Sequence, residues 1–130
     1  MSSLTILLIE DDTVDAMLFW RRIVPKDIKL VQIHLTTLDD AVAWLTQHRA
    51  DLIVTDLHMA PYQGIEIIDK IRSVSETTPI ISRSGSVSLQ TRMTLRDAGV
   101  RTHLQKGDDD EAVVLRDVIE QLMRDTVYGV

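Results

Sequence analysis

The sequence predicts an α/β fold in which five parallel strands form one sheet with helices on both faces, a doubly wound arrangement. Short apolar runs alternate with longer segments that repeat apolar residues at helical spacing, and the connections between them are short. Two of the runs are apolar without alternation, as expected for strands that are buried on both faces. At 130 residues and 45 % hydrophobic content, the chain is long enough for one domain with its own core.

The first strand and helix follow directly from this pattern. Leu4–Ile9 is a continuous β-favouring run. The segment that follows repeats residues at helical spacing until Pro25 stops the helix: Val14, Met17, Leu18, then Trp20 or Arg21, and Val24. Such a stripe is expected to face the core.

The middle elements continue the alternation. Ile28–Leu35 alternates apolar and polar residues, which predicts a half-covered strand at the edge of the sheet. Thr37 begins a capping box with two acidic residues, and therefore a helix. A buried strand then ends at Asp56, and a helix with an isoleucine stripe begins near Ile65.

The last third predicts two more strand and helix units. Pro79–Ser84 is a strand whose proline takes the first position, where a missing N–H donor is tolerated. A helix over 87–98 ends at Gly99, and Val100–Leu104 is the fifth strand. The acidic run 108–111 favours the start of the last helix, because carboxylates stabilise a helix N-terminus.

Polar residues stand where the predicted strands end, and these ends meet at one edge of a parallel sheet. The carboxylates there are hard oxygen donors, which suit Mg²⁺. A lysine and a hydroxyl beside a metal-bound carboxylate suit phosphoryl transfer, with the carboxylate as nucleophile that forms an acyl phosphate. In chain order these residues are Glu10, Asp11, Asp12, Asp56, Ser84, Gly85 and Lys106.

Four motifs carry a resemblance to a known family: "LLIEDDTVDAMLFWRRI", "DLIVTDLHM" with a glycine five residues later, "TPIISRSG" and "HLQK". Together they resemble the receiver domains of two-component response regulators, which are similar in fold to the single-domain chemotaxis regulator. The resemblance covers essentially the whole chain. It implies a flavodoxin-like (βα)5 sheet of strand order 2-1-3-4-5 and a single receiver domain over residues 1–130, with no effector domain.

The resemblance also implies a role for each matching residue. Asp56 is expected to accept the phosphoryl group, with Lys106 and Ser84 assisting it. Ser84 and His103 are the expected switch residues, and His103 stands where the family usually has Tyr or Phe. The expected neighbours of the phosphoryl group are His58, Met59 and Gly85, and the expected Mg²⁺ ligands are Glu10 through water, Asp11, Asp56 and the backbone carbonyl of His58.

The implied protein is a switch more than an enzyme, although it catalyses its own phosphorylation and dephosphorylation. Its implied partners are a sensor histidine kinase or phosphotransfer protein and an unnamed downstream protein. A homodimer through the fourth helix, fifth strand and fifth helix is one further interpretation. A net charge of −6, the absence of cysteine and an N-terminus without a basic leader argue against nucleic-acid, disulfide and membrane classes and favour the cytoplasm.

Several departures from the family pattern leave other interpretations open. Gly107 replaces the usual proline after Lys106, so we expect a trans bond there. Arg83 lies in an apolar strand and must snorkel, pair with an acid or meet an uncovered part of the sheet. The alternatives are a pseudo-receiver that binds partners without phosphorylation, a metal-dependent phosphohydrolase and a flavin-binding module of the same fold.

Overall fold

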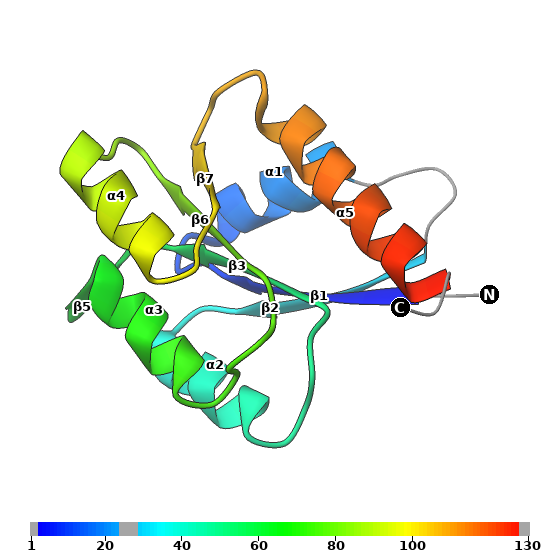
Figure 1. The fold of residues 1–130 in the computed structure, drawn as a ribbon, viewed down its shortest axis with the longest axis horizontal. Helices are drawn as coiled ribbons and strands as arrows, with labels where there is room; N and C mark the ends of the chain where they lie inside the picture. Colours follow the sequence, from blue (N-terminus) through cyan, green and yellow to red (C-terminus); the bar gives the residue numbers. More distant parts are fainter. Residues whose placement is uncertain (1–2, 24–28, 128–130) are drawn as a thin grey trace.

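The computed structural model describes residues 3–23 and 29–127, and it contains the five predicted alternations of strand and helix (Figure 1). A short hairpin that the sequence did not predict, β4–β5, follows the third strand. The elements are β1 (Ser3–Ile9), α1 (Thr13–Ile23), β2 (Lys29–Leu35), α2 (Leu38–Leu45), β3 (Leu52–Asp56), β4 (His58–Met59), β5 (Tyr62–Gln63), α3 (Ile65–Arg72), β6 (Ile80–Ser84), α4 (Leu89–Asp97), β7 (Thr102–Gln105) and α5 (Glu111–Val127).

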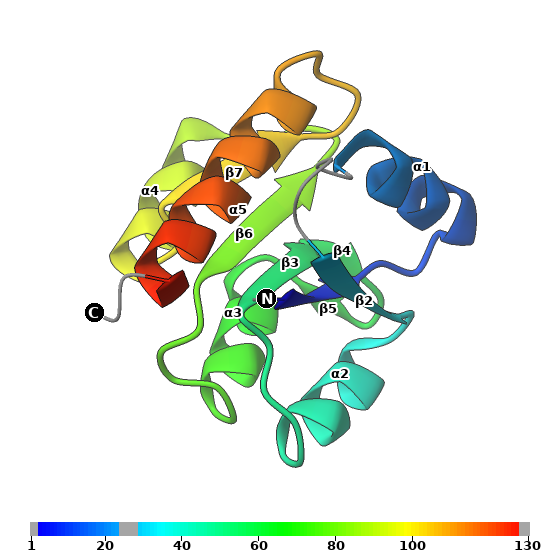
Figure 2. The same cartoon turned by 90° about the vertical axis from the view of Figure 1, so that its right-hand side faces the viewer.

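The main sheet has the order β2-β1-β3-β6-β7, and every neighbouring pair is parallel. Counted along the main sheet's own strands, this is the predicted order 2-1-3-4-5. Figure 2 shows the layers from the side, with α1 and α5 above the sheet and α2 and α3 below it. The fold therefore has the doubly wound form that its sequence predicts.

Side-chain alternation along the strands divides the core into two clusters, one on each face of the sheet. Leu7 and Ile9 of β1 pack with α2, α3 and α4, whereas Leu4, Ile6 and Leu8 pack with α1 and α5. Successive strand residues point to opposite faces. In β3, Asp56 is in phase with residues of the α1–α5 cluster, so the strand directs its terminal carboxylate toward that side.

The predicted inner face of the first helix is wrong. Val14, Met17 and Leu18 are 58 %, 50 % and 42 % exposed. The helix is apolar on more than one side, and its buried residues are instead Ala16, Phe19 and Ile23, which also repeat at helical spacing. This orientation buries the aromatic ring of Phe19 against the sheet.

Other predicted boundaries differ by one to two residues, as is usual at element ends. The expected capping box of α2 is present in part, because the Thr37 hydroxyl accepts a hydrogen bond from the Asp40 N–H at 3.1 Å. Val24, Pro25 and Ile28, on which two predicted boundaries depended, lie outside the described residues. In the described part of the chain, no helix combines the length and apolarity needed to cross a bilayer.

Candidate functional site

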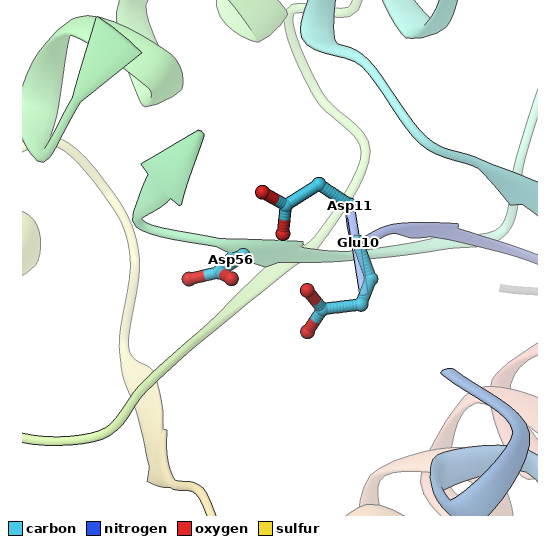
Figure 3. Close-up of side chains that lie close together, drawn as sticks. All are labelled: Glu10, Asp11 and Asp56. Carbon is cyan, nitrogen blue, oxygen red and sulfur yellow. The ribbon is translucent and has the colours of Figure 1, made fainter. Parts of the chain in front are cut away.

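Three carboxylates converge where β1 and β3 end, and Figure 3 shows them together. Glu10 and Asp11 follow β1, and Asp56 closes β3. One oxygen of each lies within 4.8 Å of the others. The paired strands β1 and β3 place these acids side by side, as the sequence predicts for the carboxyl ends of a parallel sheet.

Asp56 is buried and held by two hydrogen bonds. Its Oδ1 accepts from the backbone N–H of His58 at 3.0 Å, and its Oδ2 accepts from the Lys106 ammonium at 2.9 Å. Asp56 is therefore fixed in one orientation, with a positive charge at one of its oxygens.

Lys106 lies at the centre of the cluster. Its Nζ donates to Oε1 of Glu10 at 2.6 Å and lies 2.9 Å from Oδ2 of both Asp15 and Asp56. Burial alone would lower the pKa of Lys106, but the bonds to these three carboxylates outweigh it and raise that pKa above its usual value. The lysine that the sequence predicted is thus a stable cation at the site.

The two acids beside Lys106 respond to their surroundings in opposite ways. Burial raises the pKa of Glu10 to about 7, although bonds from Lys106 and from the Asp12 N–H oppose the change. For Asp15, burial also acts to raise the pKa, but the bond from Lys106 and the charge of Arg83 outweigh it and lower the pKa. Of these two acids, Glu10 is the one whose surroundings disfavour the ionised form.

The donor set fits a divalent cation. Carboxylate oxygens are the ligands that Mg²⁺ prefers, and Asp11 is exposed, so one side of the cluster is open to solvent. Asp12 has a different task, because its Oδ1 accepts from the backbone N–H groups of Val14 and Asp15 at 2.9 and 3.0 Å and so caps α1. Glu10, Asp11 and Asp56 are the residues that would hold the ion.

The hydroxyl side of the site is organised by His103. The imidazole of His103 lies between two serines of β6, with Nδ1 at 2.7 Å from the Ser82 hydroxyl and Nε2 at 3.0 Å from that of Ser84. The Ser84 hydroxyl also donates to the carbonyl of Ser86 at 3.1 Å. Burial, with a contribution from the charge of Arg92, lowers the pKa of His103 and favours its neutral form.

The remaining predicted residues lie in the segments that follow β3 and β6. His58 is exposed on β4, Met59 is buried in the core, and Gly85 is exposed after β6. The Lys106–Gly107 bond is trans as expected, since among the described residues only Ala60–Pro61 is cis. Gly107 has φ of 81°, a conformation that glycine adopts without steric cost.

Sequence reasoning missed three residues that contact members of this site or Arg83 beside it. They are Asp15, which pairs with Lys106, Ser82, which contacts His103, and Glu111, which pairs with Arg83. Asp15 gave no signal of its own, and Glu111 was interpreted only as part of an acidic helix start. The anomaly of Arg83 was visible in the sequence, and its partners are acids, which is one of the three expected solutions. A buried arginine in a strand indicates that an acid lies next to it in the fold, but the sequence does not show which acid.

Comparison with known proteins gives a consistent match. The family model for the response regulator receiver domain matches residues 6–125. Transcription factor SKN7 of Saccharomyces cerevisiae is 30 % identical over 114 residues, which are 85 % of this chain but only 18 % of that protein. The chain therefore spans a small part of this relative.

Two solved structures share the fold at low identity. The phosphorylated cyanobacterial phytochrome response regulator RcpA superposes with a TM-score of 0.79 at 20 % identity, covering 94 % of this chain and 95 % of that one. The second is the receiver domain of the sensor histidine kinase PA1611 from Pseudomonas aeruginosa, which was solved with magnesium in its active-site cleft. It superposes with a TM-score of 0.70 at 20 % identity, covering 95 % of this chain and 97 % of that one.

Proposed function

The chain belongs to the response regulator receiver domain family, and from this premise we propose that it accepts a phosphoryl group on Asp56 in a Mg²⁺-dependent reaction. The donor would be the phosphohistidine of a sensor histidine kinase or phosphotransfer protein. Phosphorylation would then change a surface that a downstream protein recognises. The observation that supports this most strongly is the pairing of the Asp56 carboxylate with the Lys106 ammonium beside two further acids.

The proposed transfer follows from the bonds that hold Asp56. A carboxylate oxygen attacks the phosphorus, the P–N bond of the phosphohistidine breaks, and the imidazole nitrogen keeps the electron pair and takes a proton from water. The product is an acyl phosphate on Asp56. Lys106 lies close enough to Asp56 to donate to a phosphoryl oxygen and to offset its negative charge.

Ser84 is the proposed hydroxyl donor to the phosphoryl group. In the structure its hydrogen bonds go to His103 and Ser86, so this role requires the hydroxyl to turn away from them. Such a turn would break one of the two bonds that hold His103. That is a direct route from the site to β7 and the surface near α4.

Magnesium would supply positive charge that offsets the crowded carboxylates and the phosphoryl oxygens. Glu10, Asp11 and Asp56 are the residues that would hold it, joined on the family pattern by the backbone carbonyl of His58. The magnesium of the PA1611 receiver supports this assignment by analogy of fold.

The experiment is incubation with acetyl phosphate with and without Mg²⁺, followed by intact-mass measurement. We expect a phosphoryl adduct that requires Mg²⁺ and is absent from Asp56→Asn, which keeps the size of the side chain. Asp12→Asn is the matched control, because Asp12 caps α1 and is not one of the three clustered acids.

An adduct on Asp56→Asn, or none on any protein with several phosphodonors, would contradict the proposal. The second result would favour the alternative of a phosphorylation-independent interaction module. Turnover of a phosphate ester without any kinase would favour a phosphohydrolase instead.

A further inference from the structure

Arg83 is buried inside the sheet, and the proposed transfer does not use it. It lies in β6, opposite Asp56 of β3 in the strand register, and is 1 % exposed. An arginine remains charged in proteins, so its burial is costly unless partners offset the charge. The groups that contact the guanidinium therefore indicate the role of Arg83.

One side of the guanidinium is bound to the start of α5. Nε of Arg83 donates to Oε1 of Glu111 at 2.6 Å, and the guanidinium carbon lies 4.9 Å from the centre of the Phe19 ring. Glu111 is itself buried. This pair alone would account for an arginine that serves only to pack the core.

The other side of the guanidinium is directed toward the acidic cluster. Nη2 lies 3.4 Å from Oδ1 of Asp15, and Nη1 lies 3.6 Å from Oε1 of Glu10. Nη1 is buried and has no hydrogen-bond partner, so this nitrogen is not saturated by the core pair. Its nearest ion-pair acceptor is the oxygen of Glu10 that also accepts from Lys106.

Arg83 and Lys106 are thus two cations that share the same acids. Asp15 bridges them, with Oδ1 toward Arg83 and Oδ2 toward Lys106, and Glu10 Oε1 faces both. A divalent cation that binds Glu10 therefore competes with a charge that is already present. Unlike a lysine at the surface, Arg83 cannot leave, because it is enclosed by the core.

We propose that Arg83 is a built-in cation of the acidic site that weakens its affinity for Mg²⁺ and positions Glu10 and Asp15. The inference rests on the proposed function, since it concerns the same metal site. Arg83 is a positioning residue here, because it acts through Glu10 and Asp15. Its physical consequence is a site that fills only at higher Mg²⁺ concentration than its carboxylates alone would require.

The test is calorimetric titration with Mg²⁺ of the parent protein and of Arg83→Met/Glu111→Leu. The double substitution removes one buried charge of each sign, which proteins often tolerate without loss of stability. We expect its Mg²⁺ affinity to rise about tenfold, the order of magnitude for loss of a unit charge at the edge of such a site. Arg83→Lys keeps the positive charge but not the planar guanidinium, and we expect its Mg²⁺ affinity to stay closer to that of the parent than the affinity of the double variant does.

A second variant, Glu111→Gln, tests the same inference if the double variant does not fold. Glu111→Gln leaves Arg83 in place but removes its nearest anion, so the cation acts more strongly on Glu10. We expect the Mg²⁺ affinity of this variant to fall about threefold. The two variants should therefore shift the affinity in opposite directions.

The outcomes separate this inference from the proposed function. A parent protein that binds no Mg²⁺ would contradict the proposed function, and the inference would fall with it. If the parent binds Mg²⁺ and the folded variants bind it with the same affinity, only the inference about Arg83 is overturned. Arg83 would then be a residue that only packs the core.

Discussion

The two faces of β6 carry polar groups of opposite kinds. Toward α1 and α5, Arg83 enters a network of charges with Glu111, Asp15 and Glu10. On the other face, Ser82 and Ser84 hold the neutral imidazole of His103. Both are buried polar arrangements in one strand, but losing a charged partner costs far more than losing a hydroxyl.

This difference indicates how the site divides its tasks. The charged face lies beside the acids that would hold the metal, where fixed charge sets affinity. The neutral face can exchange one hydrogen bond for another at small cost, which suits a group that moves. Substitutions on the two faces should therefore have different sizes and different readouts.

The largest expected effect is that of Arg83→Met alone. It leaves the buried Glu111 with only the partly exposed Arg22, 3.9 Å away, and breaking a buried ion pair in this way costs about 3–5 kcal/mol. Urea unfolding of the parent and the variant measures the free energy of unfolding. Adding Glu111→Leu should restore most of the loss, whereas a single variant as stable as the parent would contradict the charged network.

Lys106→Met should have the next largest effect. It removes the ammonium that joins Glu10, Asp15 and Asp56, and we expect the free energy of unfolding to fall by about 2 kcal/mol, because each of these carboxylates loses one charged partner. Because Mg²⁺ would replace the missing positive charge, it should raise the thermal midpoint of the variant more than that of the parent. If Mg²⁺ raises the thermal midpoint of the parent and of the variant equally, Lys106 and the metal do not interact with the same acids.

Ser82→Ala tests the neutral face and should cost about 1 kcal/mol, the usual value for one hydrogen bond between uncharged groups. Chemical unfolding measures this loss. Titration of the same variant should give the parent's Mg²⁺ affinity, since the affected group is uncharged. A changed affinity would remove the distinction between the two faces.

The smallest expected effect is a pH dependence of stability from His103. Its pKa lies below the ordinary value of 6.5 in the folded protein, so the unfolded chain takes up a proton first as the pH falls through 6.5. Its contribution to stability is therefore present above that pH and is lost below it. Glu10, with its raised pKa, contributes with the opposite sign between about 7 and 4.5.

The contribution of His103 is isolated by comparison with His103→Gln, in which the imidazole is absent and the other groups remain. The parent should lose stability relative to this variant as the pH is lowered below 6.5. Parallel stability curves for the two proteins would show that His103 does not titrate as described.

Much of this architecture was predictable from local pattern. Apolar runs gave the strands, and the residues that follow them gave Glu10, Asp11, Asp56 and Lys106. The inner face of α1 was not predictable, because that helix is apolar on two sides and only packing against the sheet chooses between them. The partners of Arg83 come from the end of β1, from α1 and from α5, all distant from Arg83 in the sequence, and no local spacing identifies them.

The central claim is that Asp56 is the phosphoacceptor, and the most direct test is to locate the modified residue chemically. After incubation with acetyl phosphate and Mg²⁺, borohydride reduces an acyl phosphate to the corresponding alcohol, and peptide mass mapping then identifies the position. We expect homoserine at position 56 and at no other acid. Homoserine at Asp11 or Asp15, or unmodified Asp56 in a protein that carries a phosphoryl adduct, would contradict the claim.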